Sequence, residues 1–230
     1  MDFKSDTIVI VPTYNESKNV SNLLNIFIES DFDILIIDDN SPDGTATIVK
    51  NYLGKYTNVH LLERSGKLGL GSAYRDGFNW ALKREYKSIV EMDADFSHSF
   101  SDLNNLNIYK KDYDLVIGSR YVSGGKTEGW SKGRKLLSVT ANKIAKNLLN
   151  IKVNDMTSGF RIYSRECLKS INYENTKSNG YAFQIEMTLL VSINDRSIKE
   201  IPITFYERSL GDSKMSKAIV YEAIKFLFEN

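Results

Sequence analysis

Five short runs of almost wholly apolar residues recur along the first half of the chain, and they limit the fold more than any other feature. They read TIVIVP, DILIID, NVHLLE, SIVEM and DLVIGS, at 7–12, 33–38, 58–63, 88–92 and 114–119. A strand with one wet face alternates apolar and polar residues, whereas a strand covered on both faces is apolar throughout. The pattern therefore predicts a mainly parallel, Rossmann-like sheet with helices on both faces, an α/β fold in a single domain.

The segments between and after these runs have helical periodicity. Apolar residues recur three and four positions apart between Val20 and Ile28, and helices are also predicted over 45–53, 71–84 and 134–150. Residues 121–135 are rich in glycine and lysine, which predicts a mobile loop. A last strand at 198–208, a loop and a terminal helix through 218–228 complete the expected order.

Length and composition exclude several classes of protein. The 230 residues suit one domain, and a net charge of +1 gives no general affinity for nucleic acid. The single Cys167 cannot form an internal disulfide, which fits a reducing compartment. Because neither a secretory signal nor an apolar run of about 18–20 residues is visible, a cytoplasmic protein without a membrane span is expected.

Polar residues follow four of the predicted strands directly. These residues are PTYNE at 12–16, DDNSPDGT at 38–45, DAD at 93–95 and GSR at 118–120. In open α/β sheets, ligands bind outside the carboxyl ends of the strands. The four segments are therefore expected to form one site.

Asp93 and Asp95, one residue apart at a strand end, are candidate metal ligands. A calcium loop of the EF-hand type is excluded, because His98 and Asn104 stand where glycine and glutamate are required. Two close carboxylates instead suit Mg²⁺ or Mn²⁺, which keep coordination positions open for substrate phosphates. The structural alternative is a helix N-cap formed by Asp95 or Ser97.

Other motifs carry weaker signals. Asp38 and Asp39 end a buried strand, where a carboxylate can bind a base or ribose, although turn chemistry explains the SPDG that follows. The glycines of 66–77 fit neither the dinucleotide fingerprint nor the P-loop, which favours a turn before a helix. His60 lies in a predicted strand and is expected to be packed, and no chemistry is assigned to His98.

Four cations lie in or beside loops that follow strand ends. Solvated surface charge explains any one of them, whereas four that converge would form a clamp for phosphate oxygens. The four are Arg120, Arg134, Arg208 and Lys214.

Taken together, the segments resemble the family 2 glycosyltransferases and, within them, the dolichyl-phosphate mannose synthases. The resemblance runs from about 7 to 216 and rests on VPTYNE, DDNSPDGT, GLGSAYRDG, MDADFSH, GSRYVSGG, TSGFRIY, SNGYAFQIEM and ER-x-x-G-x-SKM. It implies a GT-A fold, with a nucleotide-sugar half at about 1–119 and an acceptor-binding half at about 120–230. The implied reaction is inverting transfer of a sugar, with GDP-mannose favoured as donor, to a polyprenyl (dolichyl) phosphate.

The resemblance also implies roles for individual residues. The nucleotide sugar would be bound by Pro12, Tyr14, Glu16, Ile37, Asp39, Asp93, Ala94, Asp95, Arg208 and Lys214. The metal would be held by Asp93, Asp95 and Ser97, where some relatives have glutamine at the last position. The acceptor phosphate would be bound by Arg120, Arg134 and Ser138, and the catalytic set would be Asp93, Asp95, Arg120 and Arg208.

A phosphate acceptor explains arginines without an obvious base. With a second pKa near 6, a phosphate monoester is largely a dianion at neutral pH and can attack without losing a proton. Glu186 and Asp155 are candidate bases if the acceptor is a hydroxyl. The resemblance places the protein at the cytoplasmic face of a membrane, where a small membrane subunit is an expected partner and the amphipathic helix at 134–150 lies either on the anionic surface or against the core.

Other functions stay open on the sequence alone. The same fold can use UDP-glucose or another nucleotide sugar, or transfer to a glycan hydroxyl, although a hydroxyl acceptor needs no phosphate clamp. A nucleotidyltransferase also pairs acids at a strand end but carries a basic glycine-rich loop where this chain has PTYNE. Intact acids and arginines speak against a non-catalytic nucleotide-binding or scaffold protein.

Overall fold

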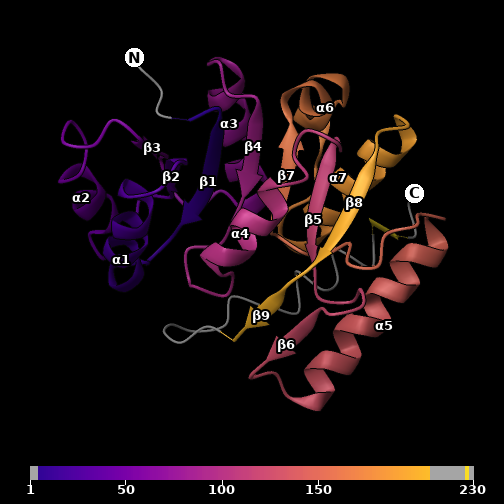
Figure 1. Cartoon of the computed structure of the whole chain (residues 1–230). Helices are drawn as coiled ribbons and strands as arrows, with labels where there is room; N and C mark the ends of the chain where they lie inside the picture. Colours follow the sequence, from indigo (N-terminus) through magenta and orange to yellow (C-terminus); the bar gives the residue numbers. More distant parts are fainter. Residues whose placement is uncertain (1–4, 208–225, 228–230) are drawn as a thin grey trace.

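A seven-stranded sheet forms the centre of the molecule in the computed structural model, which describes residues 5–207 and 226–227 (Figure 1). The strand order across the sheet is β3-β2-β1-β4-β7-β5-β8. The strands are β1 (Thr7–Thr13), β2 (Asp33–Asp38), β3 (Val59–Glu63), β4 (Ser88–Glu91), β5 (Leu115–Ser119), β7 (Arg161–Ser164) and β8 (Ile198–Pro202). All five apolar runs of the first half therefore form strands of this sheet, as predicted.

The sheet is parallel except at β7, which pairs antiparallel with both β4 and β5. The sequence analysis missed β7, because the strand has only four residues and begins with a charged one. The Arg161 guanidinium is fully buried, yet it donates to the carbonyl oxygens of Met156, Ser158 and Gln184. These hydrogen bonds offset the cost of burying the charge.

Helices cover both faces of the sheet, as the apolar strands require. Alternate residues of β1 point to opposite sides: Ile8 and Ile10 belong to one core cluster, and Val9 and Val11 to the other. One cluster is covered by α3 (Leu70–Leu82), α6 (Arg165–Ser170) and α7 (Gly180–Ile193), with the short 3₁₀ turn η1 (Tyr173–Asn175). The other is covered by α1 (Ser17–Ile28), α2 (Thr45–Lys50) and α4 (Phe100–Asn107). The predicted α/β single-domain fold is confirmed.

A smaller unit lies beyond one end of the sheet. It consists of β6 (Lys126–Glu128) and β9 (Thr204–Tyr206), paired in parallel, with α5 (Lys132–Leu148) beside them in Figure 1. Two expectations need correction here: 121–135 contains a strand and the start of a helix, and the last predicted strand is divided. The division falls at Ile203, whose side chain is buried and whose N–H donates to Ser119 while its carbonyl accepts from Lys126. Of the predicted terminal helix only Phe226 and Leu227 are described; both are helical and pack against the core, while the rest of that helix and the loop before it lie outside the described residues.

Two further expectations concern single features. His60 is packed as predicted: its ring lies 5.0 Å from that of Trp80, and its Nε2 is 3.2 Å from the Tyr86 hydroxyl. No helix in residues 5–207 is both long and apolar enough to span a bilayer.

Candidate active site

The predicted site lies where the strand order reverses. From β1 the chain proceeds outward through β2 and β3, then returns to place β4 on the other side of β1. Ligands bind at such a switch point, outside the carboxyl ends of the strands. Here β1 leads into PTYNE and β4 into DAD, so the topology brings these two segments to the same crevice.

The two acids that follow β2 have different roles. Asp38 is fully buried and accepts hydrogen bonds from the Thr13 hydroxyl and from both the backbone N–H and the hydroxyl of Ser41, at 2.7–2.9 Å. Asp38 therefore holds the turn together. Asp39 instead pairs with the guanidinium of Arg64, which follows β3, at 2.9 Å.

Burial raises the pKa of Asp39, and the neighbouring Arg64 charge opposes that rise. Arg64 also lies 3.3 Å from Asp76 of α3, so it bridges two acids. This arrangement holds a buried carboxylate at the end of β2, where the sequence predicted nucleotide binding. Sequence reasoning found Asp39 but missed Arg64, because a single arginine after a strand is unremarkable by itself.

The other predicted nucleotide-binding residues lie around the same strand ends. Pro12 pairs with Ile37 across β1 and β2, and the Ile37 side chain is fully buried in the core, so this side chain does not face a ligand. Lys67 lies 4.6 Å above the Tyr14 ring. Glu16 is buried and accepts a hydrogen bond from Asn19 at 2.8 Å, so it also fixes the start of α1.

The acid pair after β4 is only partly exposed. The Asp93 side chain is 39% accessible, while Asp95 is 5% accessible and accepts a hydrogen bond from the Ser97 N–H at 3.0 Å. Ala94 and Ser97 are also buried. The helix N-cap is Ser99, whose hydroxyl accepts from Asp102, so the alternative that Asp95 or Ser97 caps α4 is wrong.

The acid pair fits a divalent cation completed by substrate. In the described part of the chain, no group of three His, Cys, Asp or Glu side chains comes together to hold a metal. Mg²⁺ is bound in many enzymes by one or two carboxylates plus substrate phosphates and water, which needs no third protein acid. Asp93 and Asp95 supply hard oxygen ligands of this kind, and Asp93 is accessible from the crevice.

His98 connects the acid pair to a row of aromatic side chains, here called the aromatic wall, which consists of His98, Phe160, Phe205 and Trp130. Its Nε2 lies 3.3 Å from the Asp93 carboxylate, and its ring stacks on Phe160 with centroids 4.6 Å apart. Phe205 of β9 meets the same imidazole edge-on at 5.2 Å and the Trp130 indole at 5.4 Å. The wall therefore joins the acid pair to the β6–β9 unit. No pattern in the sequence predicts this contact, because Phe205 is more than a hundred residues from His98.

Arg120, which follows β5, is held by a buried partner. Its backbone N–H, Nε and Nη2 all donate to the Asp155 carboxylate, at 2.9, 2.8 and 2.6 Å. Burial opposes the charge, but the attraction and hydrogen bonds of Asp155 outweigh it and raise the pKa of Arg120. The guanidinium also lies about 5.5 Å from the Trp130 and Phe205 rings. Asp155 is thus the partner of Arg120 and is poorly placed to act as a general base.

The other acceptor-side residues lie on α5. Arg134 pairs with Glu207 at 2.8 Å and lies 4.1 Å above the Trp130 ring. Ser138 accepts a hydrogen bond from the Tyr121 hydroxyl at 2.6 Å. The aromatic wall therefore extends from the acid pair through Trp130 to both predicted arginines.

The remaining candidates are Arg208, Lys214 and Glu186. Arg208 and Lys214 lie outside the described residues. Glu186 of α7 accepts hydrogen bonds from the backbone N–H groups of Lys177 and Ser178, so it shapes the loop before its own helix.

The α/β fold and the residues at its strand ends agree with the family that comparison of the sequence with known families identifies. The model of glycosyl transferase family 2 matches residues 8–171, and the chain belongs to this family. The resemblance inferred from the sequence motifs is thereby confirmed.

Two relatives are similar to this chain over nearly its whole length. The chain is 43% identical to the polyprenol monophosphomannose synthase of Mycolicibacterium smegmatis, over 95% of this chain and 84% of that protein. It is 41% identical to the undecaprenyl-phosphate mannosyltransferase of Micrococcus luteus, over 94% of this chain and 90% of that protein.

Solved structures confirm the architecture. The glucosyl-3-phosphoglycerate synthase of Mycobacterium tuberculosis, in complex with Mn²⁺, uridine diphosphate and glucosyl-3-phosphoglycerate, superposes with a TM-score of 0.68. The match covers 97% of this chain and 78% of that one at 18% identity, which supports the GT-A fold alone.

Proposed function

We propose that this chain is a hexosyltransferase that moves mannose from GDP-mannose to a polyprenyl phosphate, with inversion, and releases the nucleoside diphosphate. Membership of glycosyl transferase family 2 and the names of both relatives support this reaction. The observation that carries the proposal is the continuous wall from Asp93 through His98, Phe205 and Trp130 to Arg134. It supports a site in which the predicted metal-binding acids and phosphate-binding cations act together.

On the donor side, Asp93 and Asp95 would hold Mg²⁺ or Mn²⁺ against the diphosphate, with the Ser97 hydroxyl as a further oxygen ligand. The metal supplies positive charge that offsets the negative charge growing on the departing nucleoside diphosphate. The M. tuberculosis structures were determined with Mn²⁺ or with Mg²⁺ beside uridine diphosphate. Residues 1–119 form the nucleotide-sugar half of the domain in this proposal, and Arg208 and Lys214, which lie outside the described residues, are further candidates for donor binding.

On the acceptor side, the phosphate dianion attacks the anomeric carbon without a general base. Such an attack needs cations to reduce the repulsion between the acceptor phosphate and the donor diphosphate. Arg120 is fixed for this task, because Asp155 anchors its Nε and Nη2. Arg134 and Ser138 on α5 would complete the acceptor site in the half formed by residues 120–230.

The polyprenyl acceptor places this reaction at a membrane surface. We therefore propose a peripheral protein at the cytoplasmic face, with α5 turned toward the bilayer. A small membrane subunit is a further proposed partner.

The test is transfer of radiolabel into the organic phase. Purified protein is given polyprenyl phosphate in detergent with Mg²⁺ and labelled GDP-mannose or UDP-glucose, with and without a chelator. We expect metal-dependent transfer from GDP-mannose alone. Transfer from UDP-glucose alone would keep the mechanism and overturn the donor, and transfer to a glycan hydroxyl but not to polyprenyl phosphate would overturn the acceptor.

Arg134→Gln tests the acceptor side separately. The variant should raise the KM for polyprenyl phosphate and leave that for GDP-mannose unchanged, because Arg134 lies on the acceptor side of the wall. Lys132→Gln, on the same helix, is the matched control. If Arg134→Gln and Lys132→Gln had the same KM for polyprenyl phosphate, the assignment of Arg134 to the acceptor site would be contradicted.

A further inference from the structure

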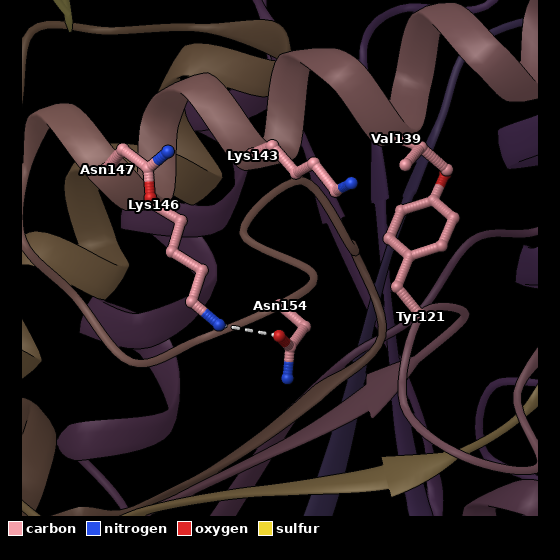
Figure 2. A pocket seen from close by; sticks show the side chains of 6 residues that line it. All are labelled: Tyr121, Val139, Lys143, Lys146, Asn147 and Asn154. Carbon is pink, nitrogen blue, oxygen red and sulfur yellow. Dashed lines mark hydrogen bonds between the residues drawn. The ribbon is translucent and has the colours of Figure 1, made fainter.

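A cavity of about 380 Å³ lies beneath α5 (Figure 2). It is lined by Tyr121, Val139, Lys143, Lys146, Asn147 and Asn154. One water occupies about 30 Å³ in the liquid, so the space suits a group the size of a phosphodiester with part of its hydration shell. Neither the acid pair nor the predicted acceptor arginines line this cavity, and the transfer reaction leaves it without a role.

The charge of this cavity is positive. Within the described residues, Lys143 has no hydrogen bond or ion pair, and Figure 2 shows its side chain directed toward the cavity. Lys146 donates to the neutral amide of Asn154 at 2.7 Å. Asn154 is itself bound to Glu200, whose carboxylate already accepts three hydrogen bonds, from Asn154 and the Asp155 N–H. Two ammonium groups without an acidic partner therefore face the same space.

The whole helix shares this charge. α5 carries five cationic side chains and no acid over Lys132–Leu148. Taking these five from the chain's net charge of +1 leaves −4 for the remainder, so the positive charge is concentrated on this element. Such a charge distribution favours an anionic partner at α5 over one elsewhere on the surface.

An exposed apolar stripe runs along α5 on a neighbouring face of the helix, about 100° from the cavity-lining residues Lys143 and Asn147. Leu137, Ile144 and Leu148 are spaced at seven and four residues, which places them on one face of the helix. They are 56%, 48% and 52% accessible, and the adjacent Leu136 is 69% accessible. Apolar side chains beside lysines are the pattern of a helix that lies in a membrane interface.

We propose that the cavity binds the phosphate headgroup of an anionic phospholipid, which is not a substrate, while the stripe contacts its acyl chains. Lys143 and Lys146 would donate to the phosphate oxygens, and Asn147 would add an amide donor. This site is separate from the acceptor site, although Tyr121 connects them: its ring lines the cavity and lies 5.1 Å from the Arg120 guanidinium. A bound lipid would hold α5, with Arg134 and Ser138, at the depth of the bilayer where a polyprenyl phosphate resides.

The experiment measures binding of the full chain to vesicles, without donor or polyprenyl phosphate, so that its outcome is independent of the proposed transfer. Vesicles contain phosphatidylcholine alone or with phosphatidylglycerol. The variant K143Q/K146Q removes the cavity lysines. The variant K132Q/K135Q removes the same charge from the same helix but leaves the cavity lining intact, and thermal melts confirm that both fold.

We expect wild-type protein to prefer the anionic vesicles and K143Q/K146Q to bind them more than about 30-fold more weakly, because direct contacts with the phosphate would add to the general attraction of roughly fivefold per lysine. The loss in K132Q/K135Q should be clearly smaller. Equal losses would mean that only the general charge of α5 matters and would overturn the cavity site.

A second arm separates a lipid from a soluble phosphate ligand. Inorganic phosphate and glycerol 1-phosphate are titrated into wild-type protein and into I144S/L148S, which shortens the stripe. We expect weak binding of both soluble ligands, and weaker vesicle binding by I144S/L148S. Tight, K143-dependent binding of a soluble phosphate with no preference for anionic vesicles would overturn the lipid proposal.

Discussion

Asp155→Asn is the substitution whose cost follows most directly from the site geometry. The change keeps the size of the side chain but removes the negative charge that faces Arg120. Asp155 is completely buried and Arg120 nearly so, and the arginine directs three donors at this one carboxylate. Removing one member of a buried ion pair costs about 3–5 kcal/mol, because the remaining charge stays without compensation. Asparagine retains one acceptor oxygen, so we expect a loss of about 3 kcal/mol.

The assay is urea unfolding of wild type and variant at neutral pH, with the free energy of unfolding extrapolated to water. Glu63→Gln is the matched control, because it breaks the ion pair with Lys50, in which both side chains are about half exposed. Exposed pairs of this kind contribute less than about 1 kcal/mol.

Sugar transfer should fall in parallel with stability at Asp155→Asn, because the Nε and Nη2 of Arg120 would lose the partner that orients them. A cost below about 1 kcal/mol, similar to that of the surface pair, would refute the reasoning. It would mean that Arg120 does not depend on Asp155 for its charge.

Three further predictions concern single side chains. Gly71→Ala should cost about 1–3 kcal/mol in urea unfolding, because its new Cβ would collide with the backbone oxygen of Ser178, whereas Gly66→Ala, with no atom within 4 Å, should be neutral. Burial raises the pKa of Glu91 from 4.5 to about 7, against the opposing effect of a nearby arginine. Between pH 4.5 and about 7 the folded state keeps a proton that the unfolded state has lost, so the free energy of unfolding should fall by roughly 3 kcal/mol as the pH rises. Glu91→Gln should remove this pH dependence. An unchanged pH dependence in the variant would contradict the role of Glu91. His98→Ala should raise the Mn²⁺ concentration for half-maximal transfer about 10-fold to 100-fold, because the imidazole orients Asp93; an unchanged metal titration would show that it does not.

The central sheet could be predicted from the sequence because its signal is local. Each of the five apolar runs is long enough to be recognised and ends in polar residues, which also predicts where the site lies. β7 and β6 carry no such signal: β7 holds a buried arginine stabilised by carbonyl oxygens, and β6 is a three-residue strand of polar residues in a glycine-rich segment. Their place depends on partners far along the chain.

The same distinction holds for the site. The types of residue at the strand ends predicted metal and phosphate chemistry, but not which acid does what. Asp38 and Asp39 are neighbours, yet one organises a turn and the other pairs with Arg64. The partner of Arg120 is 35 residues away, and the contacts of His98 with Phe205 arise only when β9 crosses the end of the sheet. Tertiary contacts of this kind leave no periodicity in the sequence.

The most direct test of the proposed mechanism is mannose transfer by Asp95→Asn. Initial rates are measured with GDP-mannose and polyprenyl phosphate across a titration of Mg²⁺ and of Mn²⁺, with Asp112→Asn, an exposed acid, as control. If Asp95 holds the cation, the variant should lose at least about 100-fold in rate at every metal concentration, since metal charge stabilisation amounts to several kcal/mol. Full metal-dependent transfer by Asp95→Asn would contradict the assignment of the metal site to the acid pair after β4.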